Sequence, residues 1–331
     1  MISNRRKRLI DKAARWVVTT GGAAIIVWLA AIFVFIAIEV YPLFGKPEIG
    51  EIYSFPAHKT YVGGHPIAIG MDEYHESSYI VSDDGEVFFF SPKILSTHSA
   101  PPLQKGGVIR LAKLDAPSKI TSVYRSVDNR GLAFGTSDGG VLSIKIKYKI
   151  GYDSNNKRII EPEIEENDLI RIIPEKSPIK LLSFAEKESD IAAAVYTEDK
   201  RFLFYGKKTT EFLLGGVKTE DFHADLSSSI TDKITSLVID GFLENLYAGS
   251  ESGNIYHFDI RERSSPKLIN TIKASSSPIT ALSFLLGDVS LVVGDGQGGI
   301  NIWFRVRDDS AETGWRLKKI HTITPPNPLL D

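Results

Sequence analysis

The chain has 331 residues and a formal net charge of −2, and 43% of its residues are apolar and 10% aromatic. This composition is ample for a sizeable hydrophobic core, and the charge balance gives no indication of nucleic-acid binding. The sequence contains no cysteine, which excludes disulfides, zinc–thiolate sites and a cysteine nucleophile.

The chain begins with a basic segment that precedes a long apolar one. Residues 1–15 hold six Lys or Arg and one Asp, whereas residues 16–38 contain no charged residue. At 1.5 Å per residue, a helix over residues 16–38 spans a hydrocarbon core of about 30 Å. The positive flank predicts that residues 1–15 stay in the cytoplasm and that the chain after Glu39 lies on the other side of the membrane.

A cleaved signal peptide is the alternative to this uncleaved membrane anchor. Signal peptides have a shorter apolar core, which a small-x-small cleavage site follows. Residues 39–47 offer neither an Ala-x-Ala sequence nor a cysteine for lipid attachment, so the anchor is favoured. Pro42 disfavours helical geometry at the preceding residue, which predicts that the helix ends near Tyr41.

Five similar segments follow a connector over residues 39–66, in which Gly50–Phe55 is a candidate strand. Each segment reads as three short strands rich in β-branched and aromatic residues, separated by turns that contain Gly or Asp. The starts are 45 to 59 residues apart, a drifting spacing near the period of roughly 40–50 residues typical of propeller blades. The segments start at Ile67, Ile120, Ile179, Ile234 and Ile279.

These repeats predict an all-β fold, a WD40-like β-propeller over residues 67–331 that one transmembrane helix precedes. The propeller has at least five blades and need not be a complete ring. The full WD40 signature is missing, because no repeat has the Gly-His pair and only Ile302–Phe304 approaches the Trp-Asp dipeptide. The sequence stops at Asp331, where a sixth repeat would begin, so we expect the chain to be the front part of a longer protein.

The stretches between the repeats predict further strands and two longer connections. We expect the outermost strands of the blades at Val108–Leu114, Leu169–Ile173, Lys267–Ile272 and Arg316–Thr322. Lys147–Asp168 is predicted to form a long exposed hairpin, and Gly215–Asp232 is predicted to be a loop. Long connections of this kind are common places for partner contacts.

No catalytic, cofactor-binding or metal-binding residue is predicted. The histidines show no zinc-binding spacing; they are His58, His65, His75, His98, His223, His257 and His321. Acidic residues recur at equivalent turns, at Asp83, Asp84, Asp138, Asp199 and Asp295. We interpret them as turn residues whose side chains hydrogen-bond the local backbone. The chain is therefore predicted not to be an enzyme, the alternative being a propeller hydrolase or dehydrogenase.

The layout of all 331 residues resembles a known family. A basic start, the apolar segment that begins Trp16-Val-Val-Thr-Thr-Gly-Gly, the ending Tyr41-Pro-Leu-Phe and a repeat domain resemble the large form of the bacterial phosphate ABC-transporter permease, the PstC-type subunit. Specific residues match around Trp16–Phe44 and near Gly314–Leu317. The resemblance implies a protein of the bacterial inner membrane with a periplasmic repeat domain. Together with the one apolar segment and its basic flank, it leads us to expect a single-pass protein with a cytoplasmic N-terminus and a periplasmic propeller. The resemblance also implies three partners: a second permease subunit, an ATPase subunit and a periplasmic phosphate-binding protein.

We therefore expect an N-terminal membrane anchor and periplasmic propeller module of a phosphate-import permease, which acts as a docking or scaffold surface. The chain lacks the later transmembrane helices and the cytoplasmic coupling loop of that family. Because one apolar helix cannot enclose a polar path, the chain is not expected to transport phosphate alone. It should contact membrane lipid and no nucleic acid. The alternative function is a free-standing membrane-anchored β-propeller scaffold for envelope protein assembly.

Overall fold

The computed structural model describes residues 4–45, 64–91, 108–126, 131–152, 156, 158–212, 215–309 and 314–323. The chain divides into two compact units, Met1–Ser54 and Phe55–Asp331. The candidate strand Gly50–Phe55 and two of the histidines, His58 and His98, lie outside the described residues.

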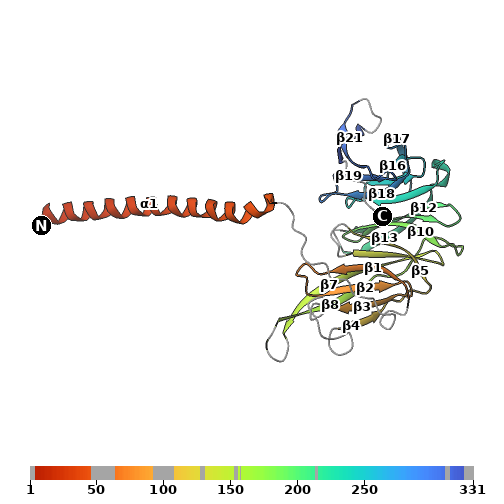
Figure 1. Ribbon diagram of the computed structural model, residues 1–331, viewed down its shortest axis with the longest axis horizontal. Coiled ribbons are helices and arrows are strands. Elements are labelled where there is room, and N and C mark those ends of the chain that lie inside the picture. The colour runs from red at the N-terminus through yellow and green to blue at the C-terminus, as the bar shows by residue number, and fades with distance from the viewer. Residues whose placement is uncertain are drawn as a thin grey trace. The chain divides into compact units, whose positions relative to one another are not determined.

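The first unit is one long helix, α1 (Asn4–Val40), followed by a 3₁₀ turn, η1 (Tyr41–Phe44) (Figure 1). The helix begins earlier than residue 16, because the preceding Arg, Lys, Leu and Ala residues are themselves good helix formers. It ends before Pro42, as predicted, with the proline in the first turn of η1. Lys12–Val40 is long and apolar enough to cross a membrane, a test that a signal sequence near an N-terminus also passes.

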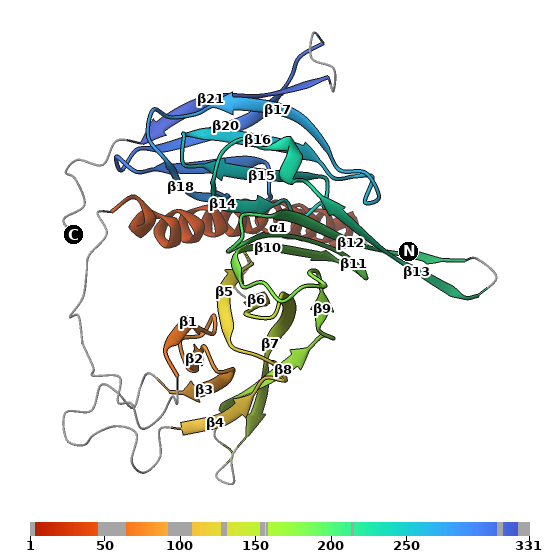
Figure 2. The same cartoon turned by 90° about the vertical axis from the view of Figure 1, so that its right-hand side faces the viewer.

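The second unit consists of five antiparallel sheets, which follow one another in chain order (Figure 2). We call each sheet a blade. Blade 1 contains β1 (Pro66–Met71), β2 (Ser78–Ser82), β3 (Glu86–Phe90) and β4 (Val108–Lys113). Blade 2 contains β5 (Ile120–Arg125), β6 (Gly131–Thr136), β7 (Gly140–Tyr152) and β8 (Arg158–Glu166), with the short β9 (Ile170–Arg171) also paired to β7.

The other three blades have four strands each. Blade 3 contains β10 (Ile179–Lys187), β11 (Asp190–Thr197), β12 (Phe202–Glu211) and β13 (Val217–Asp225). A 3₁₀ turn, η2 (Ser227–Ser229), leads to blade 4, which contains β14 (Ile234–Ile239), β15 (Asn245–Ser250), β16 (Asn254–Asp259) and β17 (Lys267–Lys273). Blade 5 contains β18 (Ile279–Phe284), β19 (Ser290–Asp295), β20 (Ile300–Arg307) and β21 (Trp315–Ile323).

Repeated four-stranded meanders of this kind are the blades of a β-propeller, so the predicted fold class is confirmed. The first strands of consecutive blades pack on one another in the order β1, β5, β10, β14 and β18. Within the described parts of blades 1 and 5, β18 does not pack comparably on β1. The five described blades therefore do not close into a ring (Figure 2).

The hydrophobic core lies between the faces of adjacent blades. Blades 3 and 4 bury the largest of these clusters, in which Phe202 and Phe258 meet edge to face with their ring centroids 5.7 Å apart. Because each inner blade is covered on both faces, its second strand runs apolar without alternation, as in Ile191–Tyr196 of β11. This burial on both faces explains why the repeats need neighbours like themselves.

Two predicted connections differ from the structure. Leu169–Ile173 is only a small part of the outer edge of blade 2: β9 (Ile170–Arg171) pairs with the start of β7, and β8, the second arm of the predicted long hairpin, pairs with the rest of that edge. The prediction of a loop over Gly215–Asp232 is wrong, since β13 (Val217–Asp225) pairs along the whole of β12. Most side chains of β13 are polar and exposed, so the strand carries no apolar periodicity that would reveal it.

The turn between the second and third strands, which we call the second turn of a blade, repeats one hydrogen-bond pattern. In blade 2, Thr136 Oγ1 accepts a hydrogen bond from the Gly140 N–H at 2.9 Å and donates one to Asp138 Oδ1 at 2.7 Å. Ser118 donates a further hydrogen bond to that carboxylate at 2.6 Å. Asp199 has the same place in blade 3. These contacts agree with the interpretation of the recurrent Asp residues as turn residues.

Asp295 differs from the others in its place within the turn. It stands where blade 2 has Thr136, and its Oδ1 accepts hydrogen bonds from the N–H groups of Gln297 and Gly299 at 3.0 and 2.9 Å. Asp83 stands at a third position, where blade 2 has Ser137, and its Oδ1 accepts a hydrogen bond from the His65 N–H at 2.8 Å. The recurrence in the sequence therefore combines three different turn positions.

We expect the propeller to lose stability as the pH falls below about 4, the unperturbed range of Asp. Hydrogen bonds from Ser252 and then Asn254 hold the pKa of Asp232 below its usual value. A carboxyl whose pKa is lowered on folding stabilises the protein above its unfolded pKa, and that contribution disappears as the pH falls through the folded pKa. Asp232→Asn should therefore lower the urea midpoint at pH 7 more than at pH 3. The exposed Asp168→Asn is the control and should lower neither midpoint; an equal loss at both pH values for Asp232→Asn would contradict the assignment.

Candidate functional site

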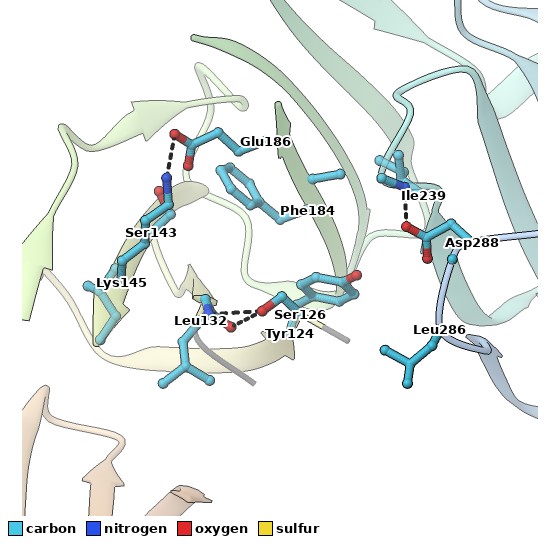
Figure 3. Close-up of a pocket in the computed structure, with 15 residues that line it drawn as sticks. Tyr124, Ser126, Leu132, Ser143, Lys145, Phe184, Glu186, Ile239, Leu286 and Asp288 are labelled. Atoms are coloured by element: carbon cyan, nitrogen blue, oxygen red, sulfur yellow. Dashed lines mark hydrogen bonds and ion pairs between the residues drawn. The ribbon is translucent and has the colours of Figure 1, made fainter. Parts of the chain in front are cut away.

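A cavity of about 310 Å³ lies at one end of the propeller, where strands of blades 2 and 3 meet β14 and the first turns of blades 4 and 5 (Figure 3). The first turn of a blade connects its first and second strands. Blades 2 and 3 form the cavity walls with β5, β6, β7 and β10, and blades 4 and 5 contribute residues of β14 and of the 240–244 and 285–289 turns. This volume is at the lower end of the range for small-molecule sites in proteins.

The cavity wall is apolar and well supported. Leu132, Phe184 and Ile239 line it, and each is at least nine-tenths buried because it also belongs to a core between blades. Tyr124 completes this wall from β5 (Figure 3). Leu286 stands at the mouth and is 88% exposed, so it is available to a molecule outside the propeller.

Few polar groups reach the cavity, and those that do have partners within the fold. Lys145 Nζ on β7 lies 2.8 Å from Glu186 Oε1 on β10, an ion pair that joins blades 2 and 3. Ser126 Oγ accepts a hydrogen bond from the Gly131 N–H at 2.8 Å, so it holds its own turn. Among the described residues, no three His, Asp or Glu side chains are placed to hold a metal ion. The arrangement can accommodate an apolar group, with the ion pair of Glu186 and Lys145 beside it.

A second cavity, of about 620 Å³, runs between the first strands of blades 2 to 5 and shares Tyr124 and Ser126 with the first. Hydroxyl groups on its walls connect consecutive blades. Thr235 Oγ1 donates a hydrogen bond to the Ile279 carbonyl, and Thr121, next to the lining residue Ser122, donates one from its Oγ1 to the Ile179 carbonyl at 2.8 Å. These hydroxyls are therefore used to fix the blades relative to one another.

Four of the histidines considered in the sequence lie on the surface: His65, His75, His223 and His321. His257 is different, because it is buried between blades 4 and 5, with its ring stacked on Tyr247 at 4.3 Å between centroids. Its Nε2 lies 2.9 Å from Asn245 Oδ1. Burial, helped by the charge of Arg305, lowers the pKa of His257 to about 3, so the ring stays neutral. The sequence did contain a signal for this position. His257 lies between Tyr256 and Phe258, and because successive side chains of a strand point to opposite faces, it lies on the other face of β16.

The first turns, which the sequence pattern did not single out, hold most of the unusual backbone. Among the described residues, six other than glycine have positive φ, and four of them lie in first turns: His75, Glu188, Leu243 and Asp288. Such positions are strained and are often found at functional sites. Apolar residues at turn positions, such as Phe242 and Leu286, were the signal that could have identified these turns.

No protein-family model and no curated protein sequence matches the chain. Solved propellers are similar to it in layout. The β-propeller domain of Myceliophteria thermophila Cps50 (Swd1) has a TM-score of 0.48 and 16% identity, covering 80% of this chain and 73% of that one. A chain of the mitotic checkpoint complex has a TM-score of 0.38 and 14% identity, with coverage of 85% and 74%. The fold assignment rests on the five sheets described above.

Proposed function

We propose that the chain is a membrane-anchored β-propeller that serves as a docking module for other proteins. Two observations together carry this proposal. The helix α1 is long enough to span a membrane, and one end of the propeller presents an apolar cavity beside the exposed Leu286. Protein-binding surfaces of this kind place apolar anchors in preformed pockets. The few polar groups in the cavity hold turns or join blades, which favours binding over catalysis.

Within this function, we propose that the module belongs to a phosphate-import ABC transporter, as part of its PstC-type permease. The support is the sequence resemblance around Trp16–Phe44 and near Gly314–Leu317, together with the membrane-spanning length of α1. The partners would be the second permease subunit, the ATPase subunit and the periplasmic phosphate-binding protein. A single apolar helix offers no polar path, so the chain is proposed to dock these proteins and not to transport phosphate.

The orientation of this module is tested by reporter fusions in a bacterial inner membrane. A periplasmic reporter, alkaline phosphatase, should be active after Phe44 and after Asp331, whereas a cytoplasmic reporter at the same positions should be inactive. The physical reason is the six basic residues and one acidic residue before Trp16, which hold the N-terminus in the cytoplasm. Cytoplasmic reporter activity at either position would overturn the proposed orientation.

The partners are tested separately by co-purification of the tagged full chain in detergent. Recovery of the second permease, the ATPase or the phosphate-binding protein supports the importer assignment. Recovery of envelope assembly proteins without any importer subunit favours the free-standing scaffold. In vesicles that contain only the full chain and the ATPase, we expect no ATP-dependent phosphate uptake, and uptake there would contradict the docking role.

A further inference from the structure

We propose that the cavity end of the propeller binds a basic segment of a protein partner by accepting one of its apolar side chains. This inference deepens the proposed docking function and rests on it. We define the docking end as the cavity of about 310 Å³ together with the first turns of blades 3, 4 and 5, residues 188–189, 240–244 and 285–289.

The docking end exposes more apolar surface than its turns need for folding. In the first turn of blade 5, Leu286 is 88% exposed, Val289 51% and Leu285 48%. The turn of blade 4 adds Phe242, which is 51% exposed. The two turns are joined by a hydrogen bond of 3.2 Å from the Gly241 N–H to Asp288 Oδ2, so their apolar tips form one surface. Contiguous exposed apolar surface beside a preformed pocket is typical of an interaction site.

The same turns are acidic. Exposed or half-buried carboxylates are contributed by Glu188, Glu244 and Asp288, and the three turns contain no Lys or Arg. The nearest cationic groups are already engaged: Lys145 pairs with Glu186 at 2.8 Å, and Lys187 lies over the Phe242 ring at 5.8 Å from its centroid. The buried Arg263 donates a hydrogen bond to the Leu243 carbonyl at 2.6 Å. The field at the cavity mouth therefore favours a positively charged partner.

The negative charge of these turns distinguishes between a lipid surface and a protein segment as the occupant of the docking end. A membrane surface rich in anionic lipid would also accept exposed leucine and phenylalanine side chains, but it would be repelled by an acidic rim. A basic protein segment satisfies both features, because its apolar side chain fills the cavity while its Lys or Arg residues face the carboxylates. The cavity is at the lower end of the range for small-molecule sites, and its volume suits one or two side chains.

The turns are also held in place before any partner arrives. Glu188, Leu243 and Asp288 have φ of 57°, 59° and 54°, and Leu243 is fully packed in the core. Residues other than glycine keep such angles only where their surroundings fix them. A pre-organised surface loses less conformational entropy on binding.

The proposal is tested with the full chain in nanodiscs and three labelled synthetic peptides. The first alternates Lys with Leu and Phe, the second has Glu in place of each Lys, and the third has Ser in place of each apolar residue. Fluorescence anisotropy should show binding of the first peptide, weakened by added salt, and at least about tenfold weaker binding of the other two. Equal binding of all three, or no binding of the first, would overturn the proposal.

Matched variants locate the site. Leu286→Ser should weaken binding of the basic apolar peptide by about tenfold or more. Ile320→Ser is the control, because Ile320 is also an exposed apolar residue, at 54%, but lies on β21; its effect should stay within about twofold. Both side chains are exposed, so neither change should disturb folding. Equal losses for the two variants would overturn the assignment to the docking end.

A single-cysteine label distinguishes a protein partner from lipid. Because the chain contains no cysteine, Leu286→Cys can carry one environment-sensitive dye. The dye emission should shift to the blue when the basic apolar peptide is added to the labelled chain. It should not shift when protein-free anionic nanodiscs are added instead. A blue shift on addition of protein-free anionic nanodiscs would mean that the docking end contacts lipid and would overturn the proposal. The reporter fusions and co-purification test the proposed function independently, so the two failures are distinguishable.

Discussion

Replacing Gly253 with Ala is expected to destabilise the propeller by about 4 kcal/mol, the sum of left-handed strain and steric overlap. Gly253 lies in the second turn of blade 4 with φ of 84°. A Cβ there would be 2.2 Å from the Ser275 carbonyl oxygen and 2.6 Å from that of Ser277. Both obstacles are backbone atoms, so relief requires the connection between blades 4 and 5 to move.

Gly298→Ala is the matched control for this prediction. Gly298 lies in the second turn of blade 5 with φ of 81°, but a Cβ there would meet no atom within 4 Å. Only the conformational strain remains, so we expect a loss of about 1–2 kcal/mol. Urea unfolding followed by circular dichroism of the β-sheets measures both values. If the two variants lost the same free energy of unfolding, the steric overlap with the backbone at Gly253 would not contribute to the loss, which would contradict the prediction.

The repeats could be predicted from the sequence because their signals are local. Four of the five predicted starts, Ile120, Ile179, Ile234 and Ile279, are the first residues of β5, β10, β14 and β18, and Ile67 is the second residue of β1. Each strand combines β-branched residues with a tight turn that follows, which are properties of a few consecutive residues. The glycines of the second turns could be recognised for the same reason.

Where local signals are absent, the prediction is wrong or incomplete. The strand β13 has polar residues on both faces, because its pairing with β12 supplies backbone hydrogen bonds without burying its side chains. In blade 3, Lys200 takes the positive φ that glycine has in the other second turns, at 66°. No glycine marks that turn, and the surrounding hydrogen bonds hold the lysine there.

The candidate site could not be predicted, because its residues are distant in the sequence. Tyr124, Phe184, Ile239 and Leu286 come from four blades and meet only when the blades pack in order. Each of the first three reads in the sequence as an ordinary core residue of its own strand. Only Leu286 is unusual locally, since an apolar residue in a tight turn gains nothing from folding when it is 88% exposed.

A second large effect is expected for Phe258→Ala, which should destabilise the propeller by about 3–5 kcal/mol. Phe258 is fully buried on β16, and its ring meets Phe202 of blade 3 edge to face. The truncation removes apolar contacts on both sides and leaves a void between two blades, which the rigid sheets cannot close.

Phe242→Ala is the control within the same blade, because Phe242 is 51% exposed, and the loss should be within about 0.5 kcal/mol. Both unfolding midpoints can be read from the same urea titration. Since blades 3 and 4 share the cluster that contains Phe258, the loss should lower the midpoint of the whole propeller and not of blade 4 alone. A separate early transition in Phe258→Ala, with the main midpoint unchanged, would mean that the blades fold independently and that the core between them does not couple them.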